Sequence, residues 1–213
     1  MKTMTSPSNQ FAEFGQRFIQ NLDQLWSELA TTTRSDVELI KRCFPFAQTI
    51  PEKPLHLHMA ECVGPGDESY FCTLDENNEE KRNVSPYLVI SRDTDEMFCA
   101  QIWQAYLLYH ANAILPYFWH GGYSRCTFIF SEDDINSISA LKNRDWTIIA
   151  PLDELLPSVF ILSDNTCRVV CHFWNEWQGM VRETYTYTLK GTHIKDVDKK
   201  QEVLYPYECG ILF

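Results

Sequence analysis

The chain has 213 residues, 45% of them hydrophobic and 14% aromatic, so it can bury a core without a metal or disulfides. Its formal net charge of -11 argues against a nucleic-acid binder, because phosphate recognition needs a concentrated basic face. The first residues, MKTMTSPSNQFAEF, contain one lysine and no apolar stretch. We therefore expect no secretory signal and a cytoplasmic location.

The first predicted elements are helices. Apolar residues recur at spacings of three and four from about Asn9 to Ala30, which is typical of an amphipathic helix. A short helix follows, in which Ser35 and Glu38 form a capping box before Pro45 ends it.

The next predicted elements are short strands. Apolar and polar residues alternate from Leu55 to Ala60, and residues 70–74 and 87–91 carry the same kind of signal. The connection DENNEEKRN between the last two is so polar that we expect little order in it.

A central helix is predicted over residues 94–115, within a stretch from Met97 to Ser124 that has no formally charged side chain. One helical stripe is polar (Gln101, Gln104 and Asn112), and the opposite stripe is apolar (Phe98, Ile102, Tyr106, Tyr109 and Ala113). This pattern predicts a core helix packed on a sheet rather than a membrane span.

Strands dominate the rest of the chain. Ser131 is a predicted helix cap after a strand at 126–130, and further strands are expected at 146–150, 159–162, 167–174, 180–189 and 203–213. Short turns between them indicate antiparallel hairpins. The predicted fold class is α+β: a mostly antiparallel sheet with the N-terminal and central helices packed on one face, in a single globular domain spanning residues 1–213.

The metal-binding hypothesis starts from His56 and His58, because alternate positions on a strand project to the same face. Cys167, Cys171 and His172 are further candidates, but adjacent strand residues point to opposite faces. The chain has no C-x-x-C pair and no H-E-x-x-H helix, so we predict no metal and no other cofactor. The eight scattered cysteines are predicted to be mostly buried thiols.

A catalytic hypothesis centres on His120 and the two glycines that follow it. Over three residues this segment resembles the His-Gly-Gly oxyanion segment of α/β-hydrolases. The residue types themselves suggest a hydrolase with His120 as base and Ser124 or Cys126 as nucleophile. The G-x-S-x-G nucleophile elbow and the alternating strand–helix pattern of that fold are both absent from the sequence.

Acidic residues form two clusters in the sequence. Residues 61–96 contain ten acids and three basic residues, and residues 131–154 contain six acids and two basic residues, which together account for the whole negative excess. The candidate binding residues are acids of the first cluster and the FWNEWQG segment: Asp75, Glu76, Glu79, Glu80, Trp174, Glu176 and Trp177.

The sequence favours a non-enzymatic intracellular protein-binding domain whose acidic and aromatic residues contact a basic protein partner. An immunity- or antitoxin-like inhibitor, which blocks the basic active site of a toxin, is its most concrete form. Two alternatives stay open: the hydrolase, and a small metal-binding domain using His56 and His58.

Overall fold

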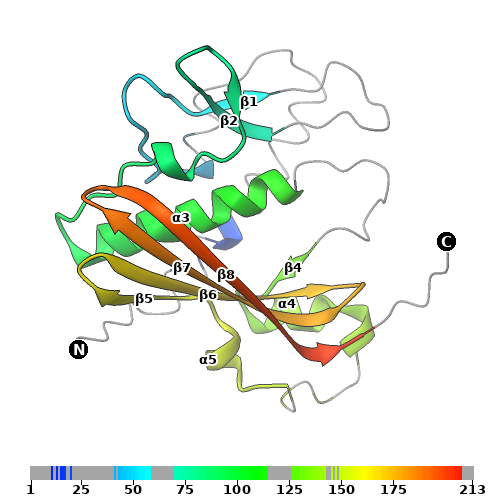
Figure 1. Cartoon of the computed structure of the whole chain (residues 1–213). Coiled ribbons are helices and arrows are strands. Elements are labelled where there is room, and N and C mark those ends of the chain that lie inside the picture. Colours follow the sequence, from blue (N-terminus) through cyan, green and yellow to red (C-terminus); the bar gives the residue numbers. More distant parts are fainter. Residues whose placement is uncertain are drawn as a thin grey trace.

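The computed structural model describes residues 44–58, 70–114, 126–142 and 149–207, together with residues 11, 13, 15–17, 20, 41, 43, 145 and 147. For residues 57, 58 and 110–114 it describes the backbone alone. The fold is α+β with antiparallel sheets, as predicted (Figure 1).

Two sheets are present in this part of the chain. The smaller one has the order β1-β2-β3. Its strands are β1 (His56–His58), β2 (Tyr70–Leu74) and β3 (Glu80–Lys81). The larger one has the order β4-β6-β7-β8, and β5 also pairs with β6. Its strands are β4 (Thr127–Phe128), β5 (Ser158–Ser163), β6 (Thr166–Asn175), β7 (Gly179–Lys190) and β8 (His193–Pro206).

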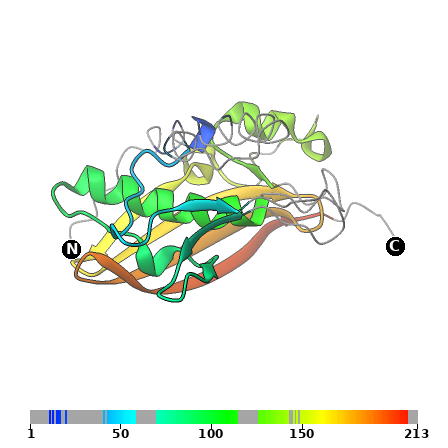
Figure 2. The ribbon, with the colours of Figure 1, turned by 90° about the horizontal axis from the view of Figure 1, so that it is seen from above.

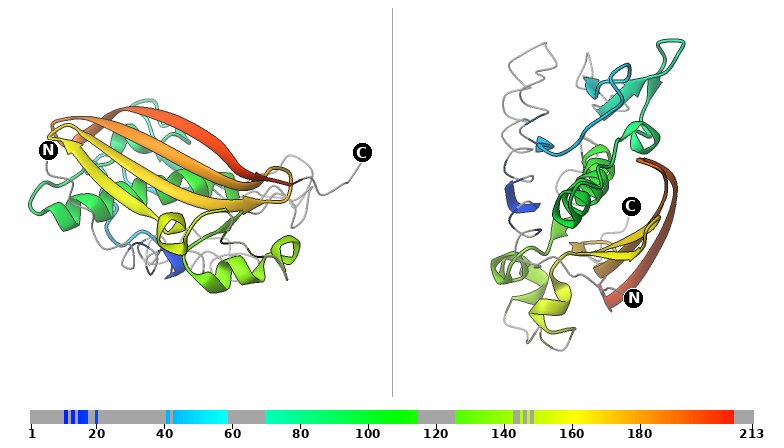
Figure 3. Two further views of the ribbon diagram at one scale, coloured as in Figure 1. Left: turned by 90° about the horizontal axis from the view of Figure 1, so that it is seen from below. Right: turned by 90° about the vertical axis from the view of Figure 1, so that its left-hand side faces the viewer.

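Helices cover both faces of the larger sheet (Figure 3). The longest is α3 (Asp95–Ile114), which packs on β5 and β6 and shares the main hydrophobic core with the face we call the α3 face. Part of the opposite face is covered by α4 (Glu132–Ser137), the 3-10 helix η3 (Ser139–Leu141) and α5 (Leu152–Leu155). The predicted central helix on one face is therefore accompanied by a second helical layer on the other. Most of the predicted helix from Asn9 to Ala30 lies outside the described residues.

The hairpin of β6 and β7 follows the predicted alternation closely. Along β7, buried residues alternate with half-buried ones from Val181 to Leu189. Gly179 begins the strand with φ 92, and a Cβ there would collide with the carbonyl oxygen of Tyr205 on β8. Glycine is thus required at this position, where β7 lies close against β8.

Two glutamines of the polar stripe of α3 lie inside the protein. Gln101 and Gln104 are buried, and each side-chain oxygen accepts a hydrogen bond from a backbone N–H on a neighbouring segment: Ser91 at 2.6 Å and Phe46 at 2.8 Å. Conversely, the Tyr109 side chain, placed on the core side by periodicity, is 48% exposed. The helix is buried on both sides because segments 44–50 and 88–91 lie against it. No helix among the described residues is long and apolar enough to cross a membrane.

Three strand predictions need correction. Residues 85–87 form the 3-10 helix η1 (Ser85–Tyr87), and after it only Leu88 and Val89 make isolated bridges. The described residues of 146–150 are not in a strand. Finally, β8 begins at His193, ten residues before the predicted start, because its charged residues conceal the strand from a search for apolar alternation.

Candidate protein-binding surfaces

The acidic connection between β2 and β3 is a tight turn rather than the weakly ordered segment expected. The Asp75 carboxylate accepts hydrogen bonds from the backbone N–H groups of Asn77 (2.8 Å) and Glu79 (2.9 Å). The Asp75 N–H in turn donates to the Glu79 carbonyl at 2.8 Å, and Asn78 takes a left-handed φ of 61. Asp75 is therefore a turn-forming residue.

The charges of this hairpin are largely compensated from within. The Lys81 ammonium lies 3.0 Å from the carboxylates of both Asp75 and Glu79. Hydrogen bonding to the backbone of Glu79 and to Lys81 lowers the pKa of Asp75 below its ordinary value. The Tyr70 hydroxyl donates to Glu80 at 2.6 Å, which leaves Glu76 as the exposed acid without such a contact among the described residues.

A second group of acids lies on the helices of the other layer. Glu132 and Asp133 occupy the first turn of α4, and Asp153 and Glu154 that of α5; we call these four the α4–α5 surface. All four are exposed, and none makes an ion pair with another described residue. These side chains therefore place four negative charges on the surface of the described structure.

The local structure of α4 explains why its acids point outward. Ser131 caps the helix by accepting from the Asp134 N–H, as predicted, and Asp134 accepts from the Phe130 N–H at 2.9 Å. Ile135 is the buried residue of the helix, so the first-turn acids fall on the solvent side. Acids in a first turn also interact favourably with the helix dipole.

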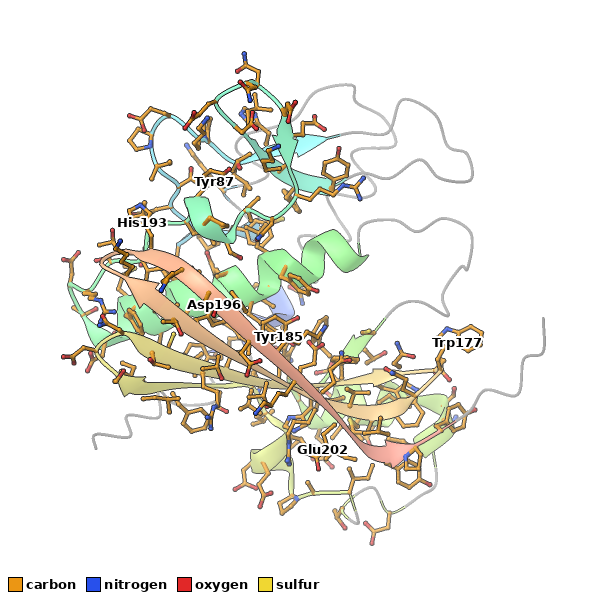
Figure 4. The ribbon with its side chains drawn as sticks, viewed as in Figure 1. Tyr87, Trp177, Tyr185, His193, Asp196 and Glu202 are labelled. Atoms are coloured by element: carbon orange, nitrogen blue, oxygen red, sulfur yellow. The ribbon has the colours of Figure 1, made fainter. Side chains whose placement is uncertain are left out.

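The two tryptophans of the FWNEWQG segment have different environments. Trp174 is only 1% exposed, packs with α4 and α5 in the second hydrophobic cluster, and donates its indole N–H to Glu176 at 3.0 Å. It therefore supports the turn from inside and is not displayed. Trp177 is 37% exposed and projects from the end of the β6–β7 hairpin (Figure 4).

The hydrolase candidates are only partly within the described residues, since His120 and Ser124 fall outside them. Cys126 is half-buried, and the Asn175 amide donates to its sulfur at 3.8 Å. Burial raises the pKa of the Cys126 thiol to about 11. A thiol that stays protonated at neutral pH is a poor nucleophile, which counts against Cys126 in that role.

The metal candidates do not gather in the described part of the chain, where no group of three or more His, Cys, Asp or Glu side chains could hold an ion. His56 and His58 lie on β1 as expected, but the side chain of His58 falls outside the description. Cys167 and Cys171 are buried, and burial raises the pKa of the Cys167 thiol to about 12. These two predicted buried thiols are confirmed.

His172 belongs to a polar row on the face that α5 covers. It pairs with Arg182 on β7, which pairs with Glu202 on β8; we call these three residues the outer row. The His172 Nδ1–H donates to the Leu155 carbonyl (2.9 Å) and Nε2 accepts from Arg182 (3.1 Å), so neither nitrogen is available to a metal. Burial, together with the Arg182 charge, lowers the pKa of His172 to about 4.

The adjacent row, on the α3 face, holds a carboxylate that sequence reasoning missed. Cys171, Glu183 and Gln201 pair across β6, β7 and β8, and we call them the inner row. The Glu183 side chain is fully buried; it accepts from Gln201 and from the Tyr106 hydroxyl (3.2 Å), and Lys199 lies 2.9 Å away. Its position among alternate buried residues of β7 was the available signal.

Comparison with known proteins adds no relative: no family model, no curated protein and no solved structure matches this chain.

Proposed function

We propose that the protein is a non-enzymatic protein-binding domain that contacts a basic protein partner through the α4–α5 surface. The observation that carries this proposal is the difference between the two groups of acids. Asp75 and Glu79 of the hairpin pair with Lys81, and Asp75 also accepts hydrogen bonds from the turn, whereas the acids of the α4–α5 surface are exposed and without an ion pair among the described residues. Uncompensated surface charge is what steers a partner of opposite sign.

An exposed aromatic side chain near the same layer supports the proposal. Trp177 follows Trp174 and Glu176 in the turn between β6 and β7, and Trp174 packs in the same cluster as Ile135 of α4 and Leu155 of α5. Tryptophan is enriched among the residues that dominate binding energy at interfaces. An exposed indole together with exposed carboxylates suits a basic protein partner that also offers an apolar contact.

The finer form of the proposal is an immunity- or antitoxin-like inhibitor acting in the cytoplasm. Such an inhibitor needs a rigid acidic surface that can cover the basic active site of an enzyme. The α4–α5 surface rests on a hydrophobic cluster of seven buried residues, which supplies that rigidity. Buried thiols such as Cys167 and Cys171 suit a reducing compartment.

A matched pair of variants tests which acids matter. One carries Glu132→Gln, Asp133→Asn and Glu154→Gln; the other carries Glu76→Gln, Glu79→Gln and Glu80→Gln, so each loses the same number of charges. We expect immobilised wild type and the hairpin variant to retain the same basic protein from a lysate at low salt, and the α4–α5 variant to lose it. Equal retention by both variants, or equal loss, contradicts the proposal.

The contribution of the aromatic side chain is tested separately on the captured partner. We expect Trp177→Ala to raise the dissociation rate with little change in the association rate, because the indole contacts the partner only after docking. Trp177→Phe, which keeps an aromatic ring, is the control and should restore most of the lifetime. An unchanged dissociation rate in Trp177→Ala removes this residue from the interface.

A further inference from the structure

The outer edge of β8 is paired only at its beginning. There Val89 bridges His193, and the Ile90 N–H donates to the Thr192 carbonyl at 2.8 Å. Next to this bridge η1 lies against β8, and no described segment pairs with the edge from residue 195 to residue 206, while β7 occupies the other side. Figure 2 shows β8 as the outermost strand of the larger sheet. An open strand edge presents backbone donors and acceptors that another strand can pair with.

Exposed apolar side chains flank the same edge. Three large apolar side chains in the described part of the chain are exposed, and two of them, Tyr109 (48%) and Val203 (46%), lie here on the α3 face. Val203 pairs with Val181, whose side chain is in the core of that face, and the Tyr109 ring lies 5.4 Å from the Lys199 ammonium. Apolar surface beside an open edge favours a covering strand.

We propose that two copies of this chain associate by antiparallel pairing of their β8 edges, about a two-fold axis that passes through Gln201. The axis keeps both α3 helices on the same side of one continuous sheet. Each residue of β8 therefore faces a residue of the second copy whose side chain lies on the same face of the sheet. In this register Lys200 of each copy faces Glu202 of the other, which gives two equivalent contacts. Lys199 faces Val203 of the second copy, and its aliphatic stem covers the exposed valine.

The charge sequence of β8 selects this register over its neighbours. If the two-fold axis passes through a charged residue, that residue faces the same residue of the second copy, so like charges are opposed. This excludes axes through Asp198, Lys199, Lys200 and Glu202. An axis through Val197 opposes Asp196 to Asp198 and Lys195 to Lys199. Among positions 197 to 202, only Gln201 gives opposite charges without a like-charge pair. Opposed like charges destabilise a strand pair, and opposed unlike charges stabilise it.

Two exposed charge reversals test the pairing in the full-length protein. Lys200→Glu alone opposes two glutamates at each of the two contacts, and Glu202→Lys alone opposes two lysines there, so each variant should be largely monomeric in sedimentation equilibrium. Mixing the two variants places the glutamates of Lys200→Glu opposite the lysines of Glu202→Lys at both contacts, so the mixture should dimerise. The double variant, which carries both reversals on one chain, also restores both unlike pairs and should dimerise again. Because the contacts in each single variant change from attractive to repulsive, we expect its Kd to rise about tenfold or more.

The control is Lys190→Glu, the same charge change at an exposed position at the far end of β7, which should dimerise like wild type. Circular dichroism confirms that each variant is folded. The proposal is overturned by a wild type that stays monomeric up to about 1 mM. It is also overturned by single variants that dimerise normally, by a double variant that stays monomeric, or by a control that dissociates equally.

Discussion

The two faces of the larger sheet differ in the surroundings of their polar side chains. On the α3 face, the inner row holds a buried carboxylate: Glu183 accepts hydrogen bonds from Tyr106 and Gln201 and pairs with Lys199. On the opposite face, the outer row runs from the Leu155 carbonyl to a surface ion pair in which Arg182 lies 3.2 Å from Glu202. The two rows are neighbours along the same three strands.

The two faces also differ in what covers them. The long helix α3 covers its face with aromatic contacts, such as the T-shaped pair of Tyr106 and Tyr185 on β7, whose ring centroids are 5.1 Å apart. In the described part of the chain, the opposite face is covered by the short helices α4, η3 and α5, whose outer side carries the α4–α5 surface. Polar groups on this side therefore extend from the core to solvent.

The largest expected effect is a pH dependence of stability caused by His172 in the outer row. In the folded protein the pKa of His172 is lowered to about 4, whereas the unfolded chain binds that proton below about 6.5. The unfolded state therefore holds more protons between these values, and the free energy of unfolding falls as pH falls from 6.5 to 4. The total contribution is about 3 kcal/mol. Urea unfolding across this range should show a shallower pH slope for His172→Phe than for wild type.

A direct control is the titration of the His172 ring by NMR in the folded protein. An imidazole that titrates near its ordinary pKa, or equal slopes in the two proteins, would show that the outer row does not hold a neutral histidine.

The next effect concerns the inner row. Lys199→Met leaves the Glu183 carboxylate buried without its cation, while the neutral donors remain. Removing one partner of a buried pair is strongly destabilising, but the Lys199 side chain is 37% exposed, so we expect a loss of about 2 kcal/mol. Adding Glu183→Gln to Lys199→Met should recover part of the loss, and a complete double-mutant cycle measures the coupling. A Lys199→Met protein as stable as wild type contradicts the assignment.

The smallest effect is expected at the outer end of the outer row. Glu202 is 63% exposed, so its ion pair with Arg182 is screened, and Glu202→Gln should cost less than about 0.5 kcal/mol. The cost should shrink further at high salt. A loss as large as that of Lys199→Met would mean that the two rows do not differ as described.

Strands with one buried face could be predicted from the sequence, and the edge strand could not. The alternation in β6 and β7 is visible because every second residue, from Cys167 and Val181 onward, enters the core. In β8, by contrast, residues 195–203 are almost all exposed, so alternation disappears although the backbone is paired. The buried glutamines of α3 have a related cause: their partners are backbone groups of distant segments, which local periodicity does not report.

The residue types of the candidate site, acids and tryptophans, could be predicted from the sequence, but which of them are exposed and unpaired could not. The sequence shows where acids are dense, but not that Lys81 bonds to two of the hairpin carboxylates while the helix acids lack such a contact in the described part of the chain. Nor does it distinguish Trp174 from Trp177, because the first continues the strand into the core and the second sits in the turn after it.

The central claim is that the carboxylates of the α4–α5 surface, rather than those of the hairpin, attract a basic partner. The most direct measurement is the association rate of the captured partner as a function of ionic strength, for wild type and the two triple variants. We predict that the α4–α5 variant associates about tenfold more slowly at low salt with a flatter salt dependence, and that the hairpin variant follows wild type. A hairpin variant with the slower, flatter profile, beside an unchanged α4–α5 variant, would contradict the claim.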